Sequence, residues 1–198
     1  MKTLLALGLC ALAGSASAAE TIRYVALVNG GTTKAGHQWV THGDDGKTTV
    51  DFLFKDNGRG PELKEEYKLA KDGTFTDYHV KGSSTFGADV DESFSRDGDK
   101  AQWKSTTDKG EQAVHGTALY TPLGGTPEAF SVAFAALAAR SDGKLPLIPS
   151  GTLTWKKLAD VDVTNGKDKR KVQLVALTGI GFTPTFAWAT TGNSPRLF

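Results

Sequence analysis

The segment Thr48–Lys55 reads TTVDFLFK, and its apolar residues Val50, Phe52 and Phe54 fall on alternate positions. A period of two is typical of a strand that buries one face, because successive side chains point to opposite sides of a sheet. The turn residues Asn57-Gly58-Arg59-Gly60-Pro61 follow at once. A half-buried strand that leads into a glycine turn predicts an antiparallel hairpin.

The same alternation recurs along the chain, and pairs of turn residues that contain glycine separate the alternating segments. Further strands are predicted at Thr21–Asn29, His37–Thr41, Glu62–Ala70, Phe75–Lys81, Glu92–Arg96, Ala101–Ser105, Ala113–Tyr120, Thr152–Leu158, Lys171–Leu177 and Thr183–Ala189. Tight turns are predicted at Asp45-Gly46, Asp72-Gly73, Asp97-Gly98, Lys109-Gly110, Asp142-Gly143 and Asn165-Gly166. Strands joined by such turns pair with their neighbours in sequence and form a meander.

One segment breaks this period. Pro127–Arg140 has apolar residues at helical spacing, with Thr126 as the expected N-cap and Pro127 at the first position. Leu145–Gly151 is expected to be a connection held by prolines. The predicted fold is therefore mainly β, an antiparallel curled sheet of about nine to twelve strands packed around one α-helix at residues 127–140. A two-sheet sandwich with an edge helix is the alternative.

The first eighteen residues have the layout of a secretory signal peptide. A positive end, Met1-Lys2, precedes the apolar run Leu4–Ala13 and small residues, so cleavage is predicted between Ala18 and Ala19. Residues 19–198 then form a single β-rich domain that is exported, either periplasmic or secreted. Cys10 lies within the apolar run, which disfavours a lipoprotein, and cleavage leaves a mature chain without cysteine.

Composition excludes some classes of protein. The chain has 23 Lys and Arg against 22 Asp and Glu, and loss of Lys2 with the signal peptide makes the two counts equal. We therefore expect no nucleic-acid partner, since a nucleic-acid binder needs a positive surface. No second apolar run is long enough to span a membrane, and a chain without cysteine has no disulfide or thiolate metal site.

No motif in the chain carries a recognisable chemistry. His37 and His42 are five residues apart, which places them on opposite faces of a strand, and the acidic residues Asp89, Asp91 and Glu92 are expected in solvated turns. The pair Asp44-Asp45 is expected to be solvated too. We therefore predict no catalytic, cofactor-binding or metal-binding residue.

The turn Asn57-Gly58-Arg59-Gly60-Pro61 is the sharpest local motif. It is expected to be structural, with Arg59 reaching a buried acid or a backbone carbonyl; the alternative is an anion-binding turn. The four tryptophans, Trp39, Trp103, Trp155 and Trp188, fall on predicted strands, where they would fill the core or make a platform for a sugar or lipid.

Several passages together resemble a known arrangement. They are Tyr24–Gly36, the 57–61 turn, Pro149-Ser150-Gly151, and Leu177-Thr178-Gly179 followed by Pro184 and Trp188. These passages resemble the N-terminal β-rich extension of secreted bacterial amidohydrolase-family proteins of the imidazolonepropionase-like type. In that family a metal-dependent (β/α)₈ barrel follows the extension and opens with His-x-His, a motif that this sequence lacks.

The resemblance implies a non-catalytic accessory domain whose partner is an amidohydrolase barrel, downstream or separate. The alternative is a free-standing periplasmic binding module for a lipid or another hydrophobic ligand, held in the concave side of the sheet. A third hypothesis is a hydrolase that uses dispersed carboxylates such as Asp51 or Asp77, which no spacing favours.

Overall fold

A computed structural model describes residues 19–198 of the chain. The predicted signal peptide, its cleavage site and Cys10 lie outside the described residues, apart from Ala19. Within the described part of the chain, no helix is long and apolar enough to cross a membrane.

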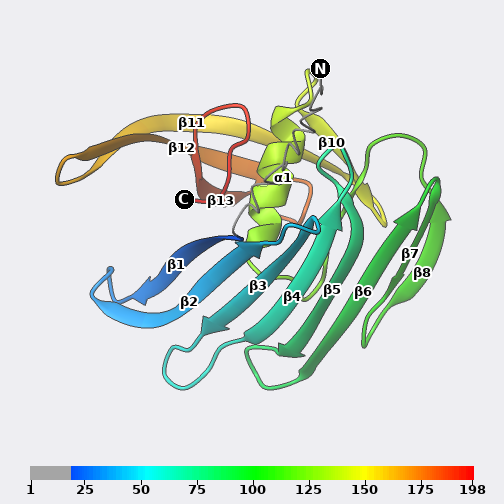
Figure 1. Cartoon of the computed structure of the whole chain (residues 1–198), viewed down its shortest axis with the longest axis horizontal. Helices are drawn as coiled ribbons and strands as arrows, with labels where there is room; N and C mark the ends of the chain where they lie inside the picture. The colour runs from blue at the N-terminus through cyan, green and yellow to red at the C-terminus, as the bar shows by residue number, and fades with distance from the viewer. Residues whose placement is uncertain (1–18) are drawn as a thin grey trace, which may run out of the picture.

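The larger of two sheets is an eight-stranded antiparallel meander that curls along its length (Figure 1). Each strand pairs with the next in sequence, as the turn pattern predicts. The strands are β1 (Glu20–Val28), β2 (Thr33–His42), β3 (Lys47–Phe54), β4 (Glu62–Leu69), β5 (Phe75–Ser83), β6 (Asp89–Asp97), β7 (Lys100–Lys104) and β8 (Lys109–Ala113).

The smaller sheet has five strands in the order β13-β12-β11-β10-β9. Its strands are β9 (Leu119–Tyr120), β10 (Lys144–Ile148), β11 (Thr152–Asn165), β12 (Asp168–Thr178) and β13 (Thr185–Thr190). Its pairs are antiparallel except β9 with β10, which run parallel. Helix α1 (Glu128–Ala138) lies between the two sheets, so the predicted mainly β fold, with a curled antiparallel sheet around one helix, is confirmed (Figure 1).

The helix is the centre of the core. Phe134 and Leu137 are 0% and 1% exposed, and Phe134 stacks on Trp155 of the smaller sheet. The helix begins one residue later than predicted, with Pro127 at the N-cap, while the hydroxyl of Thr126 accepts a hydrogen bond from the Glu128 N–H at 3.3 Å. Gln38 and Tyr67 of the larger sheet donate hydrogen bonds to Glu128 of the helix, and the helix lies on the concave side of that sheet (Figure 1).

Two predictions about strands were wrong. The proline-held connection after the helix contains strand β10, because Leu145 and Ile148 are fully buried against the core and outweigh the effect of the prolines. The predicted strand Ala113–Tyr120 is instead the end of β8, a turn at Gly116 with φ of 78°, and the short β9.

The predicted turn at Lys109-Gly110 is displaced as well. These two residues begin strand β8, and the reversal lies just before them, where the Ser105 N–H donates to the Asp108 carbonyl at 2.6 Å. The hydroxyl of Ser105 also accepts hydrogen bonds from the backbone N–H groups of Thr107 and Asp108. Side-chain bonding by serine thus supplies a turn that the search for glycine pairs missed.

Candidate functional site

The 57–61 turn is a structural hairpin turn. Asn57 and Gly58 have φ of 49° and 74°, and Asp56 and Arg59 exchange backbone hydrogen bonds of 2.8 and 3.0 Å across them. Two successive positive φ angles are what a two-residue hairpin of this twist requires. Gly60 is buried, and a Cβ there would lie 2.1 Å from the Phe54 carbonyl oxygen.

Arg59 is exposed at the tip of this turn. Residues 19–198 supply neither the buried acid nor the backbone carbonyl that we expected its guanidinium to reach. A backbone carbonyl in the turn is used by another side chain, since Lys55 Nζ donates to the Gly60 carbonyl at 2.6 Å. The anion-binding alternative for Arg59 stays a prediction.

The histidines do not gather into one cluster, and three of them each contact a single aspartate: His37 with Asp51, His79 with Asp91, and His115 with Asp99. His42 bonds to the Thr48 hydroxyl at 3.0 Å, whereas the His37 ring stacks on Trp39. Among residues 19–198 no group of three His, Cys, Asp or Glu side chains is placed to hold a metal ion. Asp51 and Asp77, the dispersed carboxylates, lie opposite different residues of β4 and do not converge.

The prediction of solvated turns at Asp89, Asp91 and Glu92 was wrong in part: all three lie in a strand, where Asp89 and Asp91 are exposed but Glu92 is buried. Glu92 lies in strand β6, is 2% exposed, and accepts hydrogen bonds from the Tyr120 hydroxyl at 2.6 Å and from the N–H groups of Leu123 and Gly124. The carboxylate therefore holds the loop between β9 and α1 onto the inner face of the sheet.

Two further glutamates, Glu65 and Glu128, are buried. Glu65 is 2% exposed and accepts from the Tyr78 hydroxyl and the Thr126 N–H, each at 2.9 Å, while its second oxygen has no hydrogen-bond partner among the described residues. Glu128, in the first turn of α1, accepts from the Ser131 hydroxyl at 3.1 Å and from the Gln38 amide at 3.4 Å. The three carboxylates thus fasten the helix and its preceding loop to the sheet.

Burial raises the pKa values of Glu65 and Glu128. Loss of solvation raises the pKa of Glu65 to about 7, against a usual 4.5, although hydrogen bonds from Thr126 and Tyr78 lower it in part. The pKa of Glu128 is likewise raised to about 7, mainly by burial and also by the charge of Glu65. The alternation of strand β4 indicates that Glu65 is buried, because Leu63, Glu65 and Tyr67 lie on the same face. We did not use this pattern to predict the position of Glu65 from the sequence.

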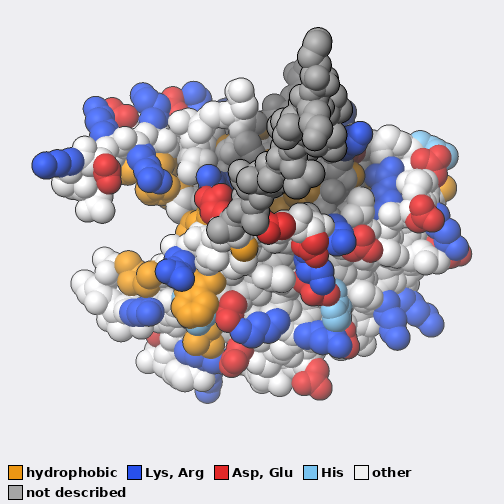
Figure 2. Space-filling view, in the orientation of Figure 1, with side chains coloured by type: hydrophobic (Ala, Val, Ile, Leu, Met, Phe, Trp, Pro, Cys, Tyr) orange, Lys and Arg blue, Asp and Glu red, His pale blue; other side chains and the backbone are white. Residues whose placement is uncertain are grey.

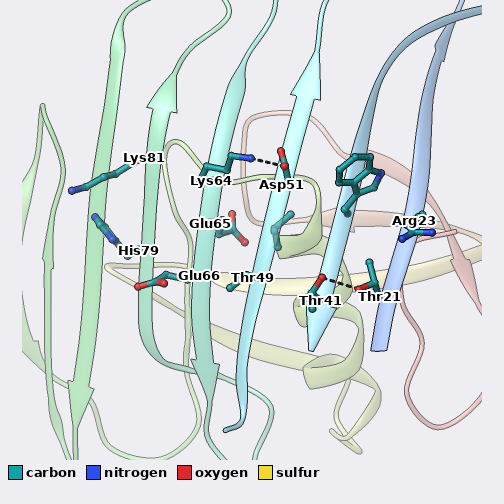
Figure 3. Close-up of a pocket in the computed structure, with 12 residues that line it drawn as sticks. Thr21, Arg23, Thr41, Thr49, Asp51, Lys64, Glu65, Glu66, His79 and Lys81 are labelled. Atoms are coloured by element: carbon teal, nitrogen blue, oxygen red, sulfur yellow. Dashed lines mark hydrogen bonds and ion pairs between the residues drawn. The ribbon is translucent and has the colours of Figure 1, made fainter. Parts of the chain in front are cut away.

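A cavity of about 680 Å³ opens on the outer face of the larger sheet, on the side away from α1 (Figure 3). We call it the outer trough. Its lining side chains come from β1 to β5 and combine hydroxyl groups, charges of both signs and one indole: Thr21, Arg23, Trp39, Thr41, Thr49, Asp51, Lys64, Glu66, His79 and Lys81. Asp51 forms an ion pair with Lys64 and lies 3.5 Å from His37 Nε2.

The smaller sheet exposes an apolar face. Val175, Leu177 and Ala189 face the core, so the alternate residues of the same strands lie on the other side, where Val172 and Ala176 are buried and the larger side chains are partly or fully exposed. These are Leu174, Phe186 and Trp188, and Phe198 joins them because its N–H bonds to the Trp188 carbonyl at 3.0 Å. Phe186, Trp188 and Phe198 are 61%, 38% and 48% exposed. We call these four residues the β12–β13 apolar face.

Arginines lie next to this face. A cavity of about 810 Å³ between β1 and the C-terminal segment is lined by Arg23, Arg170 and Arg196, together with Phe198. None of the three arginines forms an ion pair with an acidic residue among those described. The apolar face is therefore bordered by positive charge.

Hydrophobic side chains also border a hollow between the two long ribbons β1–β2 and β11–β12 (Figure 2). Val25 and Leu27 of β1 and Val161 of β11 are each at least 40% exposed.

The interior holds little room for a ligand, because α1 fills the concave side of the sheet. The apolar cavity at its border, lined by Tyr120, Leu123, Phe130 and Ile180, measures about 160 Å³. Pockets for small molecules usually measure about 300–1,000 Å³. Of the four tryptophans, Trp103 and Trp155 pack against the core, whereas Trp39 and Trp188 are exposed on different sheets.

Comparisons with protein-family models, with curated proteins and with solved structures gave no match to this chain.

Proposed function

We propose that residues 19–198 form an exported, periplasmic or secreted accessory domain that docks on the catalytic barrel of a metal-dependent amidohydrolase. The observation that carries this proposal is the β12–β13 apolar face, which leaves Phe186, Trp188 and Phe198 open to solvent. The similarity of the sequence passages to the extension of such enzymes supports the choice of partner. The hydrolytic chemistry would belong to the barrel, and this domain would position it.

The energetics favour a protein partner for this face. Burial of a large apolar side chain contributes about 1.5–3 kcal/mol, so three such residues would supply the core of an interface. The arginines beside the face would meet acidic residues on the rim of the barrel and would set the orientation of docking. A catalytic domain joined after Phe198 would lie beside this surface, because Phe198 belongs to it.

The test compares the native protein with variants in its own host. A Phe186→Ser/Trp188→Ser double variant is matched by Phe86→Ser, since Phe86 is 85% exposed but lies in the turn between β5 and β6. We expect the wild type and the Phe86 variant to purify joined to, or in complex with, a protein that has metal-dependent amide hydrolase activity.

The double variant is expected to separate from a non-covalent partner, or to make a covalently joined barrel cleavable by protease at the linker. An intact mass equal to residues 19–198, with no associated hydrolase, would contradict the proposal. Lipid found in that isolated species would instead favour the free-standing binding module.

A further inference from the structure

The outer trough lies on the larger sheet, whereas the β12–β13 apolar face lies on the smaller one, although Arg23 lines both the trough and the cavity beside that face. Apart from Glu65, which is buried on the helix side, the labelled side chains in Figure 3 rise from neighbouring strands on the solvent side, with α1 behind the sheet. A volume of about 680 Å³ falls within the range usual for small-ligand sites. The trough is therefore large enough to hold one or two sugar-sized rings.

Trp39 supplies a fixed aromatic wall. Its ring centroid is 4.2 Å from that of His37, with 24° between the planes, so one face of the indole is covered. Trp39 lines the trough while His37 does not, and the indole is still 44% exposed. The uncovered face of the ring is thus available to a flat, partly apolar ligand surface.

In the trough, hydrogen-bond donors lie next to hydrogen-bond acceptors. Lys64 is paired with Asp51, which lies directly across from Trp39 on the next strand. Glu66 is paired with Lys47 at 3.2 Å, and the hydroxyls of Thr21 and Thr41 lie 3.0 Å apart. Charges of both signs line the trough, Arg23, Lys64 and Lys81 beside Asp51 and Glu66, so neither a phosphate nor a metal cation meets only groups of the opposite charge.

We propose that the outer trough binds a neutral saccharide. One pyranose ring stacks its C–H face on Trp39, while Asp51 accepts from, and Lys64 donates to, adjacent hydroxyls of that ring. Each sugar hydroxyl is both a donor and an acceptor, so a vicinal pair matches a carboxylate beside an ammonium. The ion pair and the His37 stack hold these groups in place before the ligand arrives, which lowers the entropy cost of binding.

The test is calorimetric titration of the purified exported chain with cellotriose, maltotriose and chitotriose, and separately with inorganic phosphate. We expect at least one neutral trisaccharide to bind saturably. Trp39→Ala should weaken that binding about tenfold or more, Trp39→Phe should retain part of it, and Trp188→Ala should leave it unchanged.

Asp51→Asn provides a second variant, which keeps the size of the side chain but weakens the acceptor. Thermal unfolding checks that each variant is folded, as expected for side chains on the outer face. Absence of binding by all three saccharides up to about 10 mM would overturn the inference. Binding that Trp39→Ala leaves unchanged, or binding of phosphate alone, would overturn it as well.

Discussion

The buried carboxylates make the stability of this domain depend on pH, and Glu65→Gln isolates the effect. In the folded protein the pKa of Glu65 is raised from 4.5 to about 7, because burial disfavours the charged carboxylate. Its contribution to stability is therefore fully present below about pH 4.5 and is lost as the pH rises through about 7.

The linkage relation gives the size of the effect. With these two pKa values, the contribution of Glu65 to the free energy of unfolding falls by about 2.5 kcal/mol between pH 5 and pH 8. A glutamine does not titrate, so the variant loses this part of the pH dependence. The amide oxygen can still accept from Tyr78 and Thr126, while the amide nitrogen meets no partner and costs about 1–3 kcal/mol at every pH.

Urea unfolding at pH 5 and at pH 8, followed by tryptophan fluorescence, measures the difference. The wild type should be clearly less stable at pH 8, and the variant should show a difference smaller by about 2.5 kcal/mol. Glu66→Gln, on the opposite face of the same strand, is the matched control and should keep the wild-type difference. If Glu65→Gln and the wild type show the same pH dependence, Glu65 does not titrate as its burial requires.

Three further predictions concern single side chains and can be checked by the same unfolding assay. Gly60→Ala should destabilise the domain by several kcal/mol more than Gly58→Ala, because the added Cβ would lie 2.1 Å from the Phe54 carbonyl oxygen, whereas Gly58 has open space around it. Phe134→Ala should cost about 3–5 kcal/mol, since this ring is fully buried between the two sheets. Arg59→Ala should change the free energy of unfolding by less than about 0.5 kcal/mol, because this exposed side chain has no partner among the described residues.

Most of the fold was predictable from local pattern. Alternation identified the long strands because one face of each is buried, and the helix stood out because Phe130, Phe134 and Leu137 repeat at helical spacing. Strand β10 was missed because Pro146 suggested a connection. Pro146 pairs with Thr152, and its neighbours Leu145 and Leu147 are buried. Both features depend on tertiary packing, which a local sequence pattern does not contain.

The sites were much less predictable. Glu65 and Glu92 occupy positions that the alternation assigns to the buried face, yet their residue type favoured solvent. Their partners, Tyr78, Tyr120 and the backbone at Thr126, are far from them in sequence, so only the folded structure shows how the charges are accommodated. The outer trough could not be predicted either, because its lining residues come from five strands and are brought together only by the register in which those strands pair.

Oxidative footprinting would check the proposed docking on the native protein. The oxidation rate of Trp188 is compared between the protein purified from its own source and the isolated residues 19–198, with Trp39 as the internal reference. The proposal predicts that Trp188 is protected severalfold in the native protein relative to Trp39, since the β12–β13 apolar face would be covered by the barrel. Equal oxidation of Trp188 in both samples would show that nothing covers this face and would contradict the proposed function.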